Sequence, residues 1–189
     1  MLLVLNVLIY RLPLKENIAT ERSHCMKCGN KIKWYDLVPL VSFLILRGKC
    51  RYCKAKLSWQ YPAVEVLNGI LYGIIVLVNG FNITSILYCL ATSALLALSI
   101  IDWRTYEIPP SFNIFIGILG IIRLILDLPH WYNYVIGFVS VSGFLLLIFL
   151  VTKGRGIGFG DVKLMAAAGL LLGWKLIILS LGLGCVLGS

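Results

Sequence analysis

Two aspartates lie at the boundaries of apolar stretches of this chain. Asp102 follows a long apolar run, and Asp161 ends a Gly-Phe-Gly-Asp motif that begins at Gly158, just before another apolar run. An ionisable side chain at a membrane boundary is costly, and by default it marks a functional site. Alternatively, each carboxylate caps the end of a helix or pairs with a neighbouring cation, Arg104 or Lys163. The two aspartates are the first candidates for catalytic residues.

Two carboxylates that approach each other have a clear chemical use. Both cannot ionise at short range, so the pair holds one proton between them. The ionised partner can take a proton from an attacking water, while the protonated partner polarises the peptide carbonyl or serves the leaving amine. Gly158 and Gly160 would let the backbone approach a substrate closely. Asp102 and Asp161 therefore indicate an aspartyl protease at a membrane surface, with either one as the base.

Four cysteines form the second chemical signature, as two C-x-x-C pairs: Cys25, Cys28, Cys50 and Cys53. The spacing is close to that of four-thiolate zinc sites, which are closed and structural. A loop this poor in apolar residues needs such a staple. Disulfides, disfavoured in a reducing cytoplasm, and free thiols are the alternatives, and His24 is a less favoured ligand. We expect one structural Zn²⁺ held by the four cysteines.

Composition decides the class of protein. Hydrophobic residues make up 60% of the 189 and charged residues 13%, with a mean hydropathy of +0.93. This leaves too little polar surface to cover a soluble globule. Apolar runs, several close to the roughly 20 residues of a membrane span, predict helices at residues 63–79, 83–101, 108–126, 134–152, 162–173 and 176–189. We therefore expect an all-α protein, a polytopic transmembrane helical bundle with a small zinc-stapled cytoplasmic loop domain.

The distribution of charge orients this bundle. Residues 11–56 contain eleven of the 17 Lys and Arg residues, which predicts a cytoplasmic loop. Alternation from there places segments 102–107 and 153–161 on that same side. The net charge of +9 then reflects membrane sidedness and contact with anionic lipid, not nucleic-acid binding. Tryptophans at the ends of the runs are typical of membrane interfaces: Trp59, Trp103, Trp131 and Trp174.

The predicted organisation has three parts. Residues 1–11 are expected to be a partial first transmembrane helix, and residues 12–61 the zinc-binding loop domain. Residues 62–189 are expected to form the transmembrane protease bundle, whose last run is cut by the chain end.

With these motifs in this order, the chain resembles the type IV prepilin peptidase family of membrane aspartyl proteases. A Gly-x-Gly-Asp motif alone is weak, but the ordered set is specific and extends over nearly the whole chain. The residues that carry it are segments 5–13, 39–43, 46–51 and 61–65, the two C-x-x-C pairs, and both aspartate motifs with Lys163.

The resemblance implies a multi-pass enzyme of the bacterial cytoplasmic membrane. It would cleave the leader peptide from type IV prepilins or pseudopilins, after a glycine and at the cytoplasmic face, using Asp102 and Asp161. Family members of this kind also methylate the new amino terminus with S-adenosylmethionine. Glu65 is the candidate residue for that step, although pairing with a loop Lys or Arg explains it equally well. The expected partners are prepilins or pseudopilins and membrane lipids, with no nucleic acid.

Two other classes of protein remain open. A non-enzymatic zinc-binding membrane scaffold of a pilus or secretion system would explain the cysteines and the topology, but not the two matched aspartates. A transporter would place acidic residues nearer the membrane midplane and would show repeated halves, and no convincing repeat is present.

Overall fold

A computed structural model of the chain describes residues 28–30, 42–43 and 45–187, without the side chain of Tyr61. Within these residues the fold is helical, and β structure is limited to an isolated bridge between Lys49 and Lys56. The predicted all-α class is confirmed. Two compact units divide the chain, Met1–Thr105 and Tyr106–Ser189. The predicted partial first helix, Cys25 and His24 lie outside the described residues.

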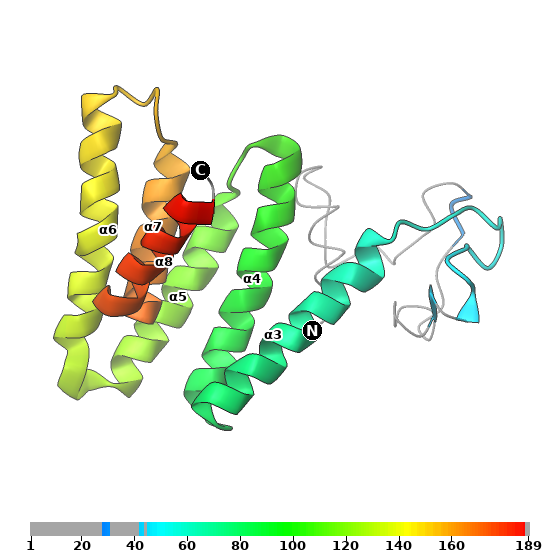
Figure 1. The fold of residues 1–189 in the computed structure, drawn as a ribbon, viewed down its shortest axis with the longest axis horizontal. Helices are drawn as coiled ribbons and strands as arrows, with labels where there is room; N and C mark the ends of the chain where they lie inside the picture. The colour runs from blue at the N-terminus through cyan, green and yellow to red at the C-terminus, as the bar shows by residue number, and fades with distance from the viewer. Residues whose placement is uncertain (1–27, 31–41, 44, 188–189) are drawn as a thin grey trace. The chain divides into compact units, whose positions relative to one another are not determined.

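The first unit contains two long antiparallel helices, α3 (Gln60–Asn79) and α4 (Ile83–Thr105) (Figure 1). The turn between them depends on Gly80, whose φ of 73° is in the region that favours glycine. Asn82 then caps α4, because its Oδ1 accepts the backbone N–H of Ser85 at 2.8 Å. The hairpin therefore begins and ends where the apolar runs predict it, within a few residues.

Polar side chains hold α3 and α4 together. Asn68 is fully buried and donates through Nδ2 to Ser93 Oγ at 3.0 Å, and the Tyr72 hydroxyl lies 2.5 Å from the same oxygen. Nearer the other end, Arg104 donates to Gln60 Oε1. Interhelical hydrogen bonds between membrane helices contribute about 0.6 kcal/mol each on average. Because they are directional, they also set the register of the two helices.

The second unit is a bundle of four α-helices with one short 3₁₀ turn (Figure 1). Its elements are α5 (Pro110–Leu126), η2 (Leu128–His130), α6 (Trp131–Val151), α7 (Phe159–Leu172) and α8 (Trp174–Leu187). Helix α7 packs against both α5 and α6, which scarcely touch each other, and α8 packs against α6 and α7. The central helix of this unit is therefore the one that carries the Gly-Phe-Gly-Asp motif.

Two contacts show how these helices alternate in direction. Ile108, just before α5, lies against Gly160 at the start of α7. The indole Nε1 of Trp174, at the start of α8, donates to Asn133 Oδ1 near the start of α6 at 3.2 Å. Helices α5 and α7 therefore begin at one end of the unit, and α6 and α8 begin at the other.

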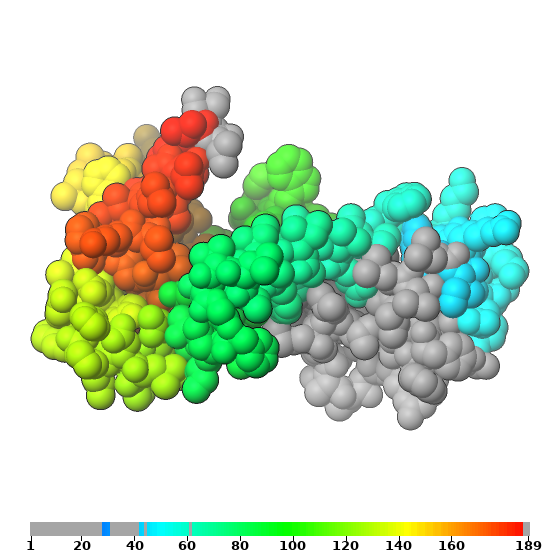
Figure 2. Space-filling view, turned by 60° about the horizontal axis from the view of Figure 1, so that its bottom comes forward, coloured from blue at the N-terminus to red at the C-terminus, as the bar shows by residue number. Residues whose placement is uncertain are grey.

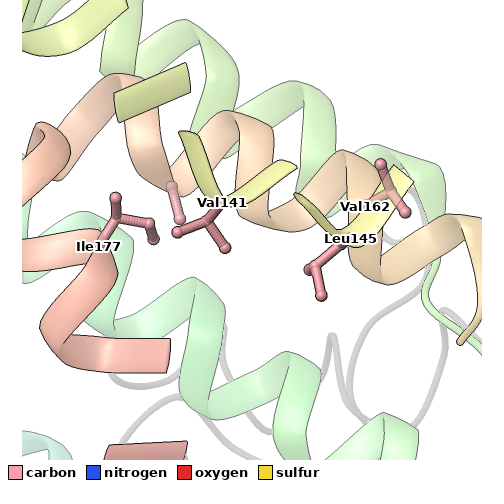
Figure 3. Packing of buried hydrophobic residues seen from close by; sticks show 5 residues of the cluster. Val141, Leu145, Val162 and Ile177 are labelled. Carbon is pink, nitrogen blue, oxygen red and sulfur yellow. The ribbon is translucent and has the colours of Figure 1, made fainter. Parts of the chain in front are cut away.

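The core of the second unit lies between α6, α7 and α8. Val141 and Leu145 of α6, Val162 of α7 and Ile177 of α8 form its centre (Figure 3). The outer side of α8 carries exposed apolar side chains such as Leu179, and the helix lies on the surface of the unit in the space-filling view (Figure 2). Apolar residues thus fill the core and also cover the outside.

Helices α6 and α7 cross at two glycines, Gly137 and Gly169. A methyl group added at either position would collide with the backbone of the opposite helix. Small residues at helix crossings in membranes let backbones approach this closely. The α6–α7 contact therefore depends on the absence of side chains at these positions.

Three helical segments are long and apolar enough to cross a membrane: Pro62–Asn79, Ile83–Thr105 and Leu128–Val151. Helices α5 and α8 are apolar but shorter. Helix α7 has 14 residues, a length of about 21 Å. These lengths and the many exposed apolar side chains confirm the predicted polytopic membrane architecture.

Candidate active site and metal centre

Asp102 lies in the last turn of α4. Its side chain is exposed, whereas the preceding Ile101 is buried at 1% exposure and anchors the helix. The helix continues past Asp102, and the positive charge of Arg104 in its last turn stabilises the negative end of the helix dipole. It ends at Tyr106, whose φ is 52°. Asp102 is therefore presented at the outer side of a helix end and beside a polar loop, as the sequence predicts.

Asp161 lies in the first turn of α7, where its side chain is partly buried. Gly158 is the N-cap residue, and its carbonyl accepts the backbone N–H of Asp161 at 3.1 Å. A Cβ at Gly158 would lie only 3.2 Å from Asp161 Oδ2. The motif therefore forms a tight turn in which the carboxylate folds back over the glycine.

The cations considered as partners of the aspartates have contacts of their own. The ammonium group of Lys163 lies 4.6 Å from the ring centre of Phe159, a cation–π arrangement. Phe159 in turn packs against Phe149 of α6, with ring centres 5.5 Å apart. Arg104 hydrogen-bonds Gln60. Lys163 therefore packs on Phe159 in the first turn of α7, and its role in the motif stays a prediction.

The two aspartates belong to different units, Asp102 to the first and Asp161 to the second. Each is presented at a helix end, next to a polar loop. Their approach to form a proton-sharing pair stays a prediction.

Sequence reasoning missed Ile108 as a residue of this region. It is partly buried, although its neighbours Tyr106 and Glu107 are exposed, and its side chain contacts Gly160 of the motif. The sequence includes Ile108 as the first residue of the apolar run 108–126, and its position directly before Pro109 is the only further signal.

The thiols of Cys28, Cys50 and Cys53 form a cluster in which all sulfur atoms lie within 4.8 Å of one another. All three cysteines are free thiols in the structure, and free thiols are the groups that a zinc site uses. Sulfurs around a tetrahedral zinc, at about 2.3 Å from the metal, would lie about 3.8 Å apart. The donor set and its spacing therefore fit a thiolate-bound zinc, and three of the four predicted ligands are together.

A tight turn presents two of these sulfurs. The backbone N–H of Cys50 donates to the carbonyl of Ala55 at 2.8 Å, and that of Leu57 donates to Gly48 at the same distance. Gly48 has a φ of 69°, and a Cβ there would lie 2.9 Å from the ring of Phe43. Glycine is thus required here for both conformation and space, and the turn aims Cys50 and Cys53 at one point.

Glu65, the candidate for the second activity, lies on α3 and is buried at 4% exposure. It precedes Asn68 by one turn and lies on the face of α3 that packs against α4. A buried carboxylate in an apolar helix is unusual, and the role of Glu65 in the second activity stays a prediction.

A polar cluster around Asp127 was not anticipated from the sequence. Its carboxylate accepts hydrogen bonds from His130 Nδ1 at 2.9 Å and from the Tyr134 hydroxyl at 2.7 Å, and Arg123 lies 3.8 Å away. The hydrogen bond from His130, followed by that from Tyr134, lowers the pKa of Asp127 below its ordinary value of 3.8. The signal available in the sequence was the spacing of Asp127, His130 and Tyr134 at positions i, i+3 and i+7, which lets the three side chains meet. This cluster joins α5 to α6 and has a structural role.

Fold and site together define a helical membrane protein with a cluster of three thiols that could hold a metal ion and two aspartates at helix ends. The profile described as "Bacterial Peptidase A24 N-terminal domain" matches residues 2–79, and that of the "Type IV leader peptidase family" matches residues 89–189. The chain belongs to the type IV leader peptidase family, a family of peptidases.

Curated relatives agree with this assignment. A "Prepilin leader peptidase/N-methyltransferase" of Stutzerimonas stutzeri is 35% identical over 92% of this chain and 62% of its own length. Proteins of the same name from Pseudomonas putida and Bacillus subtilis (strain 168) are each 31% identical, over 98% and 95% of this chain and 74% and 72% of their own length. The chain thus spans between three fifths and three quarters of these relatives. No solved structure matches it.

Proposed function

We propose that this protein is a membrane aspartyl endopeptidase that removes the leader peptide from type IV prepilins or pseudopilins. The observation that carries the proposal is the placement of both motif aspartates, Asp102 and Asp161, at helix ends beside polar loops in a chain of the leader peptidase family. The printed names of the relatives support the same substrate class.

The proposed chemistry uses the two carboxylates as one acid–base unit. One ionised aspartate removes a proton from water as the water attacks the scissile carbonyl. The other, protonated, donates a hydrogen bond to that carbonyl and later protonates the leaving amine. The apolar helix of the substrate lies against the apolar helices of the enzyme, so contact with them orients the peptide bond before reaction.

We place this reaction at the cytoplasmic face of the bacterial cytoplasmic membrane. The basic segment 11–56 supports this sidedness through the positive-inside rule. The start of α5 and the start of α7 lie at the same end of the second unit, as the topology requires. The short basic leader of a prepilin would stay on that side by the same rule.

Methylation of the new amino terminus is the second proposed activity, supported by the names of the relatives. S-adenosylmethionine would supply the methyl group. An ionised carboxylate at Glu65, which is buried, would suit a positively charged donor or substrate amine. The thiolate cluster, with zinc held by Cys28, Cys50, Cys53 and the predicted fourth ligand Cys25, would keep the cytoplasmic loop folded.

The decisive experiment combines reconstituted protein with a prepilin and S-adenosylmethionine, followed by mass spectrometry of the product. Asp102→Asn and Asp161→Asn should each reduce cleavage by several orders of magnitude, because acid and base catalysis contribute about 10²–10⁴-fold each. Asp127→Asn is the matched control, since this carboxylate lies in the structural cluster and not in the motifs. Near-normal cleavage by either motif mutant would refute the two-aspartate mechanism and favour the scaffold alternative.

A further inference from the structure

Both glycines of the Gly-Phe-Gly-Asp motif have a neighbour from this chain in the space where a side chain would lie. A Cβ at Gly158 would lie 3.2 Å from Asp161 Oδ2. A Cβ at Gly160 would lie 3.2 Å from Cβ of Ile108 and 3.5 Å from its Cδ1. The closest approach at each site is shorter than the 3.4–4 Å of ordinary van der Waals contact. The space beside each glycine is therefore already occupied.

Backbone conformation does not explain these glycines. Gly158 has a φ of −73° and a ψ of 143°, which any residue adopts. Gly160 lies within α7, and neither glycine is among the residues with positive φ. The requirement at these positions is therefore one of space.

Ile108 is held firmly where it meets Gly160. The following Pro109 restricts Ile108 to extended conformations, and Pro109 itself has a φ of −61° and forms the N-cap of α5. The backbone N–H of Phe112 donates to the carbonyl of Pro109 at 3.1 Å. The side chain of Ile108 is therefore carried by a stiff segment at the start of one helix and bears on the start of another.

We propose that Ile108 is a positioning residue for Asp161. Its side chain bears on Gly160 and sets the position of the first turn of α7, and hence of the Asp161 carboxylate one residue further on. In this proposal, glycine is needed at these two positions so that Asp161 and Ile108 can pack against them. The sequence alone instead predicts that the glycines allow close approach of a substrate. The inference deepens the proposed function and rests on it, because it takes Asp161 as the catalytic carboxylate.

A double-mutant cycle tests the pair. Gly160→Ala requires Ile108 or the first turn of α7 to shift by a few tenths of an ångström. It should therefore lower kcat for prepilin cleavage by between about tenfold and 10²-fold, the upper figure being the effect of a 1 Å misplacement, and should change KM little, because the substrate does not occupy this space. In an Ile108→Gly background, the close contact with Cβ and the contacts with the rest of the side chain are removed. The same Gly160→Ala change should then cost at least about tenfold less, a coupling of the size that touching residues show.

Two controls isolate the contact. Ile108→Val keeps the Cβ that makes the closest approach, so it should relieve the Gly160→Ala defect much less than Ile108→Gly does. Gly182→Ala adds the same methyl group within α8, where nothing lies within 4 Å, and it should show no coupling to Ile108. Equal, additive losses in the wild-type and Ile108→Gly backgrounds would overturn the proposal.

A second measurement does not depend on activity. Cysteines replacing Ile108 and Gly160 would have Cβ atoms close to the 3.5–4.5 Å spacing of a disulfide, so mild oxidation should link them, as peptide mass spectrometry would show. The pair at Ile108 and Gly158 is the control and should link more slowly. Equal rates for the two pairs would also overturn the contact. If the wild-type chain cleaves no prepilin, the proposed function fails, but the cross-linking result still decides whether Ile108 bears on Gly160.

Discussion

Replacement of Gly169 by alanine tests the crossing of α6 and α7 most directly. A Cβ at Gly169 would lie 2.6 Å from the carbonyl carbon of Gly137 and 3.1 Å from the nitrogen of Phe138. Restoring ordinary contact requires the two helices to separate by about 1 Å, since contacts begin near 3.4 Å. The backbone of α6 cannot move aside by rotation as a flexible side chain can. The two helices therefore have to separate where they cross.

The expected cost follows from this geometry. Overpacking a well-packed core by one carbon costs about 1–3 kcal/mol and occasionally more. Because the nearest neighbours of the added carbon are all backbone atoms, we expect the upper part of that range, about 3 kcal/mol, which is roughly a hundredfold in the unfolding equilibrium constant. Since α7 carries Asp161, cleavage activity should fall together with stability.

The assay is reversible unfolding in mixed detergent micelles, monitored by circular dichroism, for wild type, Gly169→Ala and a control. Gly182→Ala is the matched control, because it adds the same methyl group to a helix where nothing lies within 4 Å, and it should change stability by less than about 0.5 kcal/mol. Gly137→Ala should reproduce the defect from the other helix. If Gly169→Ala unfolds like the control, the close crossing is wrong.

Three further predictions concern other parts of the chain. Metal analysis should find one zinc per chain, and Cys50→Ser should release it and loosen the basic loop while helicity of the membrane part is retained; pure protein without zinc would contradict this. Because hydrogen bonds lower the pKa of Asp127, its stabilising effect is complete above pH 3.8 and is lost as the pH falls through the lower folded value. Acid should therefore destabilise wild type more than Asp127→Asn, and identical pH dependence would argue against the cluster. Cysteines introduced at Thr105 and Gly156 should not react with a membrane-impermeant thiol reagent applied outside intact cells. Labelling of either one would refute the predicted cytoplasmic location of these two segments.

The positions of the helices could be predicted from the sequence because apolar runs of membrane length have few alternatives to helix. The run 83–101 corresponds to α4, and the run 134–152 corresponds to α6. The boundaries differ where capping and charge act. Helix α4 continues four residues past its run because Asp102 and Arg104 tolerate a helical conformation at its end, whereas α5 starts late because Pro109 and Pro110 define its first turn.

The candidate residues of the site could be selected from the sequence, because a carboxylate at a membrane boundary and paired cysteines are rare and costly features; the grouping of Cys28, Cys50 and Cys53 agrees with the prediction, and the chemistry of the two aspartates stays a prediction. The contacts between helices could not be predicted from the sequence. Nothing in a periodic pattern indicates that Ile108 meets Gly160 or that Gly137 meets Gly169, since these pairs depend on which helices are neighbours. Asn68, together with Tyr72 and Ser93, was missed for the same reason: the sequence shows polar residues in an apolar run, but not their partners.

The unequal helix lengths have a consequence for the lipid around the protein. Helices α3 and α4, with 20 and 23 residues, match an average hydrocarbon layer of about 30 Å. Helix α5 has 17 residues and α7 has 14, so they extend only about 26 Å and 21 Å. A bilayer adapts to short helices by thinning locally, at a cost of fractions of a kcal/mol per Å of hydrophobic mismatch. Lipids with shorter acyl chains should therefore suit α5 and α7 better than the 21-residue α6 beside them, and a layer thinned there would bring head groups and water toward the first turn of α7.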